Sequence, residues 1–102
     1  MKVIITSTGR EKDSLLDDRF GRAKFFALYD KETGELNFHE NEGVNASQGA
    51  GTGAVRFVSN LDAKMVAGIN FGDKAKAGLE AANIEMKSYK PGTKISDVIS
   101  SL

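Results

Sequence analysis

The segment with the clearest chemical potential is the alternating run Gly49-Ala50-Gly51-Thr52-Gly53, which leads directly into an apolar pattern of helical period. The start of a helix carries unpaired backbone N–H groups and a partial positive charge. Glycine lets a ligand approach the backbone closely. Gly49, Gly51, Thr52 and Gly53 are therefore predicted to form part of an anion-binding site. The alternative is that these glycines only supply tight turns and a close contact between helix and sheet.

A second candidate is the charged loop Leu16-Asp17-Asp18-Arg19-Phe20-Gly21-Arg22-Ala23. In one interpretation Arg22, alone or with a neighbouring arginine, faces the binding crevice and neutralises an anion. In the other, the charged side chains of the loop pair with each other while Phe20 anchors the loop to the core. The residue types leave both interpretations open.

A third candidate is Asn70-Phe71-Gly72-Asp73, which resembles another helix start at the same crevice and makes Asn70 and Gly72 candidate ligand contacts. The alternative is that Asp73 is simply the N-cap of the next helix, because aspartate is a favoured residue at that position. His39 alternates outward on a predicted edge strand. It is therefore predicted to be a solvated side chain and not part of a site.

Composition excludes several classes of site and function. The chain has no Cys and one His, which rules out thiolate nucleophiles, thiolate-bound metals and multi-histidine metal sites. Asp17 and Asp18 are adjacent and point apart, so they are a poor carboxylate pair for a metal. We therefore predict no catalytic residue and no metal ligand. Basic and acidic residues number 14 each, which argues against nucleic acid as a partner. No apolar run approaches a membrane span, so a cytoplasmic protein is expected.

The elements that must position these residues follow from apolar periodicity. The length of 102 residues suits one domain spanning residues 1–102. Apolar runs and turn residues predict strands at residues 2–7, 25–29, 36–40, 65–69 and 84–88. Helical apolar spacing covers residues 54–61, 75–82 and 95–102.

This order of elements predicts an α/β fold with helices on both faces of a five-stranded mixed sheet. Helical crossovers make the later strands parallel, so the predicted sheet order is 3-2-1-4-5 with strand 2 antiparallel. The carboxyl ends of strands 1, 3, 4 and 5 then point the same way. The loops 8–24, 41–53, 70–72 and 90–92 gather on one rim, beside the switch point at strand 1, where α/β sheets open a crevice.

Several of these segments also occur, in the same order, in one known family. They are Phe20-Gly21-Arg22-Ala23 followed by Phe25-Phe26, the triplet Asn45-Ala46-Ser47, the helix opening Gly49-Ala50-Gly51, the strand–loop–helix at 65–82 and the Pro-Gly-Thr before the last helix. Over essentially its whole length the chain resembles the stand-alone members of the dinitrogenase iron–molybdenum cofactor biosynthesis family. That family includes NifX, NafY and the C-terminal part of NifB.

The resemblance implies a three-layer α/β/α domain with a ribonuclease-H-like motif. It also implies a carrier without catalysis that binds a metal–sulfur cluster or its precursor non-covalently. The cluster would be of the iron–molybdenum–sulfur or molybdenum–copper–sulfur type. The family's cluster-facing rim corresponds to Arg22, Gly49, Gly51, Gly53 and the loop 70–73.

We further expect a monomer that loses its cluster on purification and that meets cluster-assembly proteins. Two other functions use the same rim and stay open at this point. One is an enzyme that holds a phosphate on the glycine loop, and the other is a protein-interaction domain.

Overall fold

The computed structural model describes residues 1–45 and 48–102. The strands are β1 (Lys2–Ser7), β2 (Phe25–Asp30), β3 (Leu36–Glu40), β4 (Met65–Gly68) and β5 (Glu85–Ser88). The helices are the short 3-10 helix η1 (Glu42–Asn45), α1 (Ala50–Asn60), α2 (Asp73–Ala81) and α3 (Ile95–Ser101). Each predicted strand and helix is present, and the boundaries differ from prediction by a few residues. Within the described ranges, no helix combines the length and apolar character needed to cross a membrane.

The sheet has the predicted order β3-β2-β1-β4-β5. The strand β2 runs antiparallel to both β1 and β3, whereas β1 is parallel to β4 and β4 is parallel to β5. The tight turn after β2 allows an antiparallel return, while the helical connections around β4 force parallel neighbours. As a result β1, β3, β4 and β5 all end at the same edge of the sheet.

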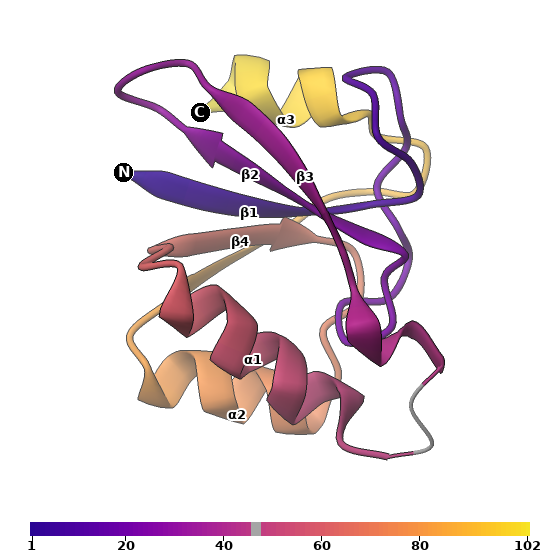
Figure 1. The fold of residues 1–102 in the computed structure, drawn as a ribbon, viewed down its shortest axis with the longest axis vertical. Helices are drawn as coiled ribbons and strands as arrows, with labels where there is room; N and C mark the ends of the chain where they lie inside the picture. The colour runs from indigo at the N-terminus through magenta and orange to yellow at the C-terminus, as the bar shows by residue number, and fades with distance from the viewer. Residues whose placement is uncertain (46–47) are drawn as a thin grey trace.

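Helices cover both faces of this sheet, which confirms the predicted three-layer architecture (Figure 1). The helices α1 and α2 lie on one face, and α3 lies on the other. Each face has its own apolar cluster. The first includes Ile4, Phe26, Val66 and Leu79, and the second includes Val3, Ile5, Ile95 and Val98. Neighbouring residues of β1 thus point into opposite layers, as strand geometry requires.

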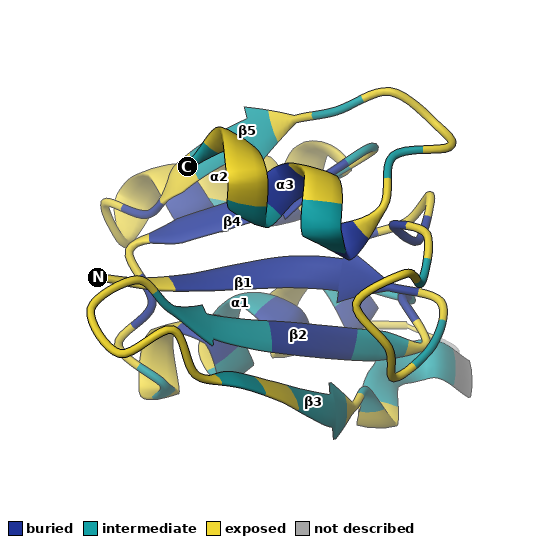
Figure 2. Ribbon diagram, turned by 90° about the horizontal axis from the view of Figure 1, so that it is seen from above, coloured by how far each residue is buried: buried dark blue, intermediate teal, exposed yellow. Residues whose placement is uncertain are grey.

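The strand β1 is the centre of the molecule, and its residues 3–7 are all buried (Figure 2). All four residues of β4 are buried as well. Both strands are continuous apolar runs, the pattern typical of strands that are covered on both faces. By contrast, β3 is an edge strand with only partial burial.

His39 on β3 differs from prediction. It was expected to be solvated, but its ring packs edge-on against Phe57 of α1 with ring centroids 5.7 Å apart. Its Nε2 atom is buried. The reason is that α1 extends over the β3 edge, so the outward position in the alternation is half-buried against a helix.

The predicted N-cap of α2 also needs correction. Asp73 is the first residue of the helix, and the capping position is held by Gly72 with φ 81° and ψ 153°. A positive φ of this size suits glycine and is unfavourable for aspartate. The chain therefore enters α2 through a glycine, as it enters α1 through Gly49.

Candidate functional site

A hollow of about 480 Å³ lies where the loop after β1 meets the starts of α1 and α2. We call it the helix-start groove. Its lining includes Arg19, Phe20, Gly21, Arg22, Gly49, Ala50, Gly51, Asn70, Phe71, Gly72, Asp73, Lys74 and Ala75. The groove sits at the edge of the sheet where β1 and β4 end, which is the predicted rim.

The structure brings together Arg22, Gly49, Gly51, Asn70 and Gly72, since all five line the helix-start groove. The other two predicted contacts lie elsewhere. Thr52 lines a shallow hollow between α1 and α2, and Gly53 lines a larger cavity between α1 and β3. Successive residues of a helix are rotated by about 100°. The first turn of α1 can therefore present only part of the run 49–53 to one groove.

Both helices that open on the groove are entered through a glycine with a positive φ, and only Gly49 has the left-handed helical conformation. Gly49 has φ 77° and Gly72 has φ 81°. No side chain in the described ranges caps either helix. The first hydrogen bonds of the two helices are those from Gly53 N–H to Gly49 O and from Lys76 N–H to Gly72 O, each 2.9 Å. The amides before them, at 50–52 and 73–75, precede the first helical bond in each case and are the donors that helix starts leave unsatisfied.

Small residues allow the two helix starts to converge. A β-carbon on Gly51 would lie 3.5 Å from the β-carbon of Ala75, so α1 and α2 are in contact at their first turns. The positive ends of two helix dipoles therefore act on the same groove. This close approach is a role for Gly51 that its position in an alternating glycine run did not reveal.

The arginine loop is held in place by two polar side chains. The carboxylate of Asp17 accepts hydrogen bonds from the backbone N–H groups of Arg19 and Lys24, both at 3.1 Å. From the end of β3, Asn41 Nδ2 donates to the carbonyl oxygens of Gly21 and Ala23, at 2.9 and 2.8 Å. The loop between residues 17 and 24 is thus fixed from two sides.

These contacts assign Asp17 a structural role. Its side chain is buried, with 6% exposure, and both of its oxygens are engaged by backbone N–H groups. Asp18 is exposed. Within the part of the chain that the structure describes, no three His, Cys, Asp or Glu side chains gather in a way that could hold a metal ion.

Aromatic rings form the inner wall of the groove. Phe20 is 1% exposed and packs against Phe26 and Phe71, each with ring centroids 5.7 Å apart. Its backbone N–H donates to the carbonyl oxygen of Asn70 at 3.0 Å. The predicted anchoring of the loop by Phe20 is confirmed, and the same contacts join the arginine loop to the loop before α2.

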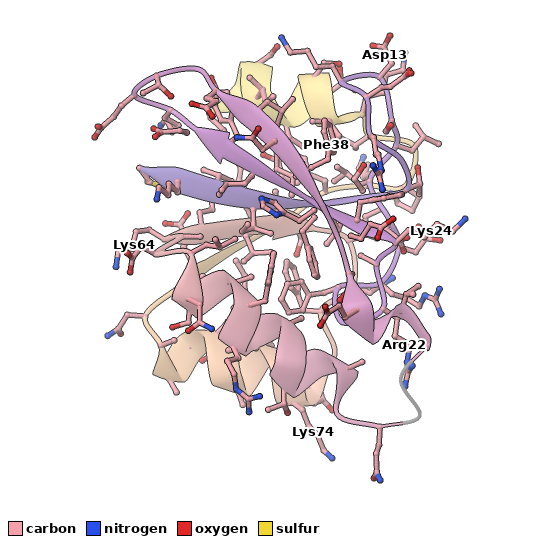
Figure 3. The ribbon with its side chains drawn as sticks, in the orientation of Figure 1. Asp13, Arg22, Lys24, Phe38, Lys64 and Lys74 are labelled. Carbon is pink, nitrogen blue, oxygen red and sulfur yellow. The ribbon has the colours of Figure 1, made fainter. Side chains whose placement is uncertain are left out.

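Cationic side chains dominate the rim of the groove. Arg19, Arg22 and Lys74 line it, against the single acidic side chain of Asp73. Arg22 and Lys74 lie at the same end of the molecule, around the starts of α1 and α2 (Figure 3). Combined with two helix starts, this arrangement can hold an anion through N–H donors and positive charge.

Three contributors to the groove escaped prediction: Asp17 and Asn41 as supports of the loop, and Lys74 as a lining residue. Phe71 also lines the groove, and it belongs to the loop 70–73 that the family resemblance had placed at the rim. The sequence does contain one usable signal. Asn41 follows a predicted strand and precedes a glycine by two residues, a setting in which Asn commonly bonds to nearby backbone. Its hydrogen bond from Gly43 N–H, at 2.9 Å, fits this pattern. Its hydrogen bonds to the carbonyl groups of residues 21 and 23 join distant parts of the chain, so the sequence around Asn41 does not predict them.

Comparison with known proteins agrees with this architecture. The apo form of the orange protein from Desulfovibrio gigas is similar, with 28% identity, a TM-score of 0.91, and coverage of 97% of this chain and 83% of that one. An NMR structure described as that of "a putative NifB protein" from Thermotoga, of the DUF35 family, has 29% identity and a TM-score of 0.84, covering 98% of this chain and 84% of that one.

No protein with a curated description matches the sequence. The family model described as "Dinitrogenase iron-molybdenum cofactor" matches residues 1–102, the whole of the chain. This chain therefore belongs to the dinitrogenase iron-molybdenum cofactor family.

Proposed function

We propose that this protein is a non-enzymatic cytoplasmic carrier that binds an anionic metal–sulfur cluster, or a thiometallate precursor, in the helix-start groove. The observation that carries the proposal is the convergence of two helix starts, each entered through a glycine, beside Arg22. Family membership supports the class of cargo. The similar orange protein is described in an apo form, which fits a fold that takes up and releases a bound group.

The chemistry of such a cargo matches the donors that the groove offers. The outer sulfides of a cluster are soft anionic hydrogen-bond acceptors. Backbone N–H groups of α1 and α2 and the guanidinium of Arg22 are suitable donors to them. A hydrogen bond to a charged group contributes about 1.5–3 kcal/mol when it is shielded from water. On an open rim the contribution is smaller and is screened by salt over roughly 8–10 Å.

The way the cargo is held also determines how it can be transferred. Because the chain has no Cys, it cannot form thiolate bonds to the metal. The contacts proposed here are hydrogen bonds and charge interactions to the sulfide surface. Such contacts break without ligand exchange at the metal, which suits a carrier that passes its cargo to an assembly protein.

Titration of the purified protein with tetrathiomolybdate and copper tests this proposal. We expect a visible charge-transfer band that elutes with the protein on gel filtration at low salt and is progressively lost as salt rises. A band that never elutes with the protein would contradict the proposal. Tight binding that does not respond to salt would contradict the mechanism, because it would require direct metal ligation. A parallel titration with inorganic phosphate tests the phosphate-binding alternative.

A further inference from the structure

A second and larger cavity, of about 650 Å³, lies between β3, η1 and α1. We call it the β3–α1 cavity. It shares only Gly49 and Ala50 with the helix-start groove, so the two hollows have largely separate linings. Its volume falls within the range of roughly 300–1,000 Å³ that is usual for small-molecule sites.

The inner part of this cavity is aromatic. The rings of Phe26 and Phe57 are stacked with centroids 5.4 Å apart and an interplanar angle of 26°. His39 lies directly opposite Phe26 in the β2–β3 register and meets Phe57 edge-on. These three residues line the cavity from two strands and a helix. A flat ring is the ligand shape that such a surface accommodates best.

His39 supplies an unsatisfied polar atom at this wall. Its Nε2 is buried, and within residues 1–45 and 48–102 it has no hydrogen-bond partner. Buried polar atoms are almost always hydrogen-bonded, so an orphan beside a cavity indicates a missing partner. Because this nitrogen is buried, an occupant of the cavity can reach it only if the imidazole ring turns about its terminal torsion, which is of the intrinsically broad type.

Two opposite charges line the same cavity without pairing with each other. Glu42 comes from η1 and Arg56 from α1, and neither forms an ion pair within the described part of the chain. The other two charged residues, Arg10 and Glu40, neutralise one another through a contact of 2.6 Å. An unpaired cation and an unpaired anion at one cavity are complementary to a ligand that carries both charges.

We propose that the β3–α1 cavity binds a small aromatic zwitterion, of which the free aromatic amino acids are the simplest examples. The ligand ring lies against Phe57, its carboxylate faces Arg56 and its ammonium group faces Glu42. A hydrogen-bonding group on the ring, such as an indole N–H or a phenol O–H, meets His39. This inference does not depend on the cargo of the helix-start groove.

Titration of ¹⁵N-labelled protein with L-tryptophan tests the ligand class. We expect saturable shifts of the amides of residues 39–43 and 53–57. Tryptamine lacks the carboxylate and indole-3-propionate lacks the ammonium group, and each should bind about tenfold or more weakly. Absence of binding by L-tryptophan, L-tyrosine and L-phenylalanine would overturn the proposal. Equal affinity for L-tryptophan and either analogue would overturn the assignment as a zwitterion site.

Substitutions in the same assay test the location. Glu42 and Arg56 are exposed, so Glu42→Gln and Arg56→Gln should preserve the fold while each weakens L-tryptophan binding about tenfold.

A substitution that fills the cavity is the second test of location. A β-carbon at Gly53 meets no described heavy atom within 4 Å. The first carbon of a leucine side chain at this position thus has room, and Gly53→Leu should obstruct the cavity and abolish binding. Ser59→Leu, on an exposed position of the same helix, is the matched control and should bind normally. Wild-type affinity in a folded Gly53→Leu variant would refute the proposed site.

Discussion

Gly21 and Gly51 meet backbone to backbone at the helix-start groove: a β-carbon on Gly21 would lie 2.8 Å from the nitrogen of Gly51 and 2.9 Å from its Cα. The loop that carries Arg22 is therefore seated directly on the first turn of α1. Any side chain at position 21 would separate the guanidinium from the amides with which we propose it acts.

Gly21→Ala should destabilise the fold, because the new methyl group would clash with the backbone of α1 and a backbone cannot move aside as a flexible side chain can. Overpacking of this kind costs roughly 1–3 kcal/mol. Urea unfolding measures the change. The control is Gly53→Ala, where the added β-carbon meets no described heavy atom within 4 Å. Since alanine favours a helix over glycine, that variant should gain roughly 0.5–1 kcal/mol. A Gly21→Ala variant that unfolds at the same urea concentration as the wild type would contradict the close backbone contact.

Asn41→Ala should destabilise the arginine loop, because the carbonyl groups of Gly21 and Ala23 would both lose their donor. Leaving buried or half-buried acceptors unsatisfied costs roughly 1–3 kcal/mol. Hydrogen exchange should accelerate at the amides of residues 19–24, and chemical denaturation should show the loss. Asn37→Ala removes only an exposed hydrogen bond to Glu35 and should change stability by no more than about 0.5 kcal/mol. Similar losses in both variants would count against a special role for Asn41.

Asp17→Asn should be more damaging than Asp18→Asn, although both remove one negative charge from the same loop. Asp17 is buried and accepts two backbone hydrogen bonds, whereas Asp18 is exposed. In the variant, one of these N–H groups would face an amide NH₂ instead of an oxygen. We expect a loss of about 1.5–3 kcal/mol for Asp17→Asn, the range for a hydrogen bond to a charged group. Thermal unfolding of the two variants provides the comparison, and equal melting temperatures would disprove the assignment.

Arg22→Ala should lower thiometallate affinity about tenfold at low salt, which corresponds to about 1.4 kcal/mol. The effect should shrink as salt rises, since salt screens exposed charges. Lys64→Ala is the matched control. Lys64 precedes β4, at the opposite end of the molecule from Arg22 (Figure 3). It should leave affinity unchanged. Equal effects of the two substitutions would show that overall charge, and not the groove, drives binding.

Strand order was predictable because local patterns reported directly on burial. The unbroken apolar runs at residues 3–5 and 65–69 indicated strands covered on both faces, and the structure buries β1 residues 3–7 and all of β4. Helical spacing then required crossovers, and crossovers allowed few topologies. The position of the rim followed, because strand ends in this topology have fixed directions.

Which side chains meet at that rim depended on contacts between segments far apart in the chain. His39 faces α1 because that helix extends over the edge strand, and Thr52 and Gly53 turn away from the groove that Gly49 and Gly51 line. Asn41 supports a loop that lies about twenty residues earlier in the chain. The apolar periodicity of a segment predicts which of its side chains face the core and which face solvent. It does not record which distant backbone will come within 3 Å of it, and for this protein that distance is set by how the loop and two helices pack together.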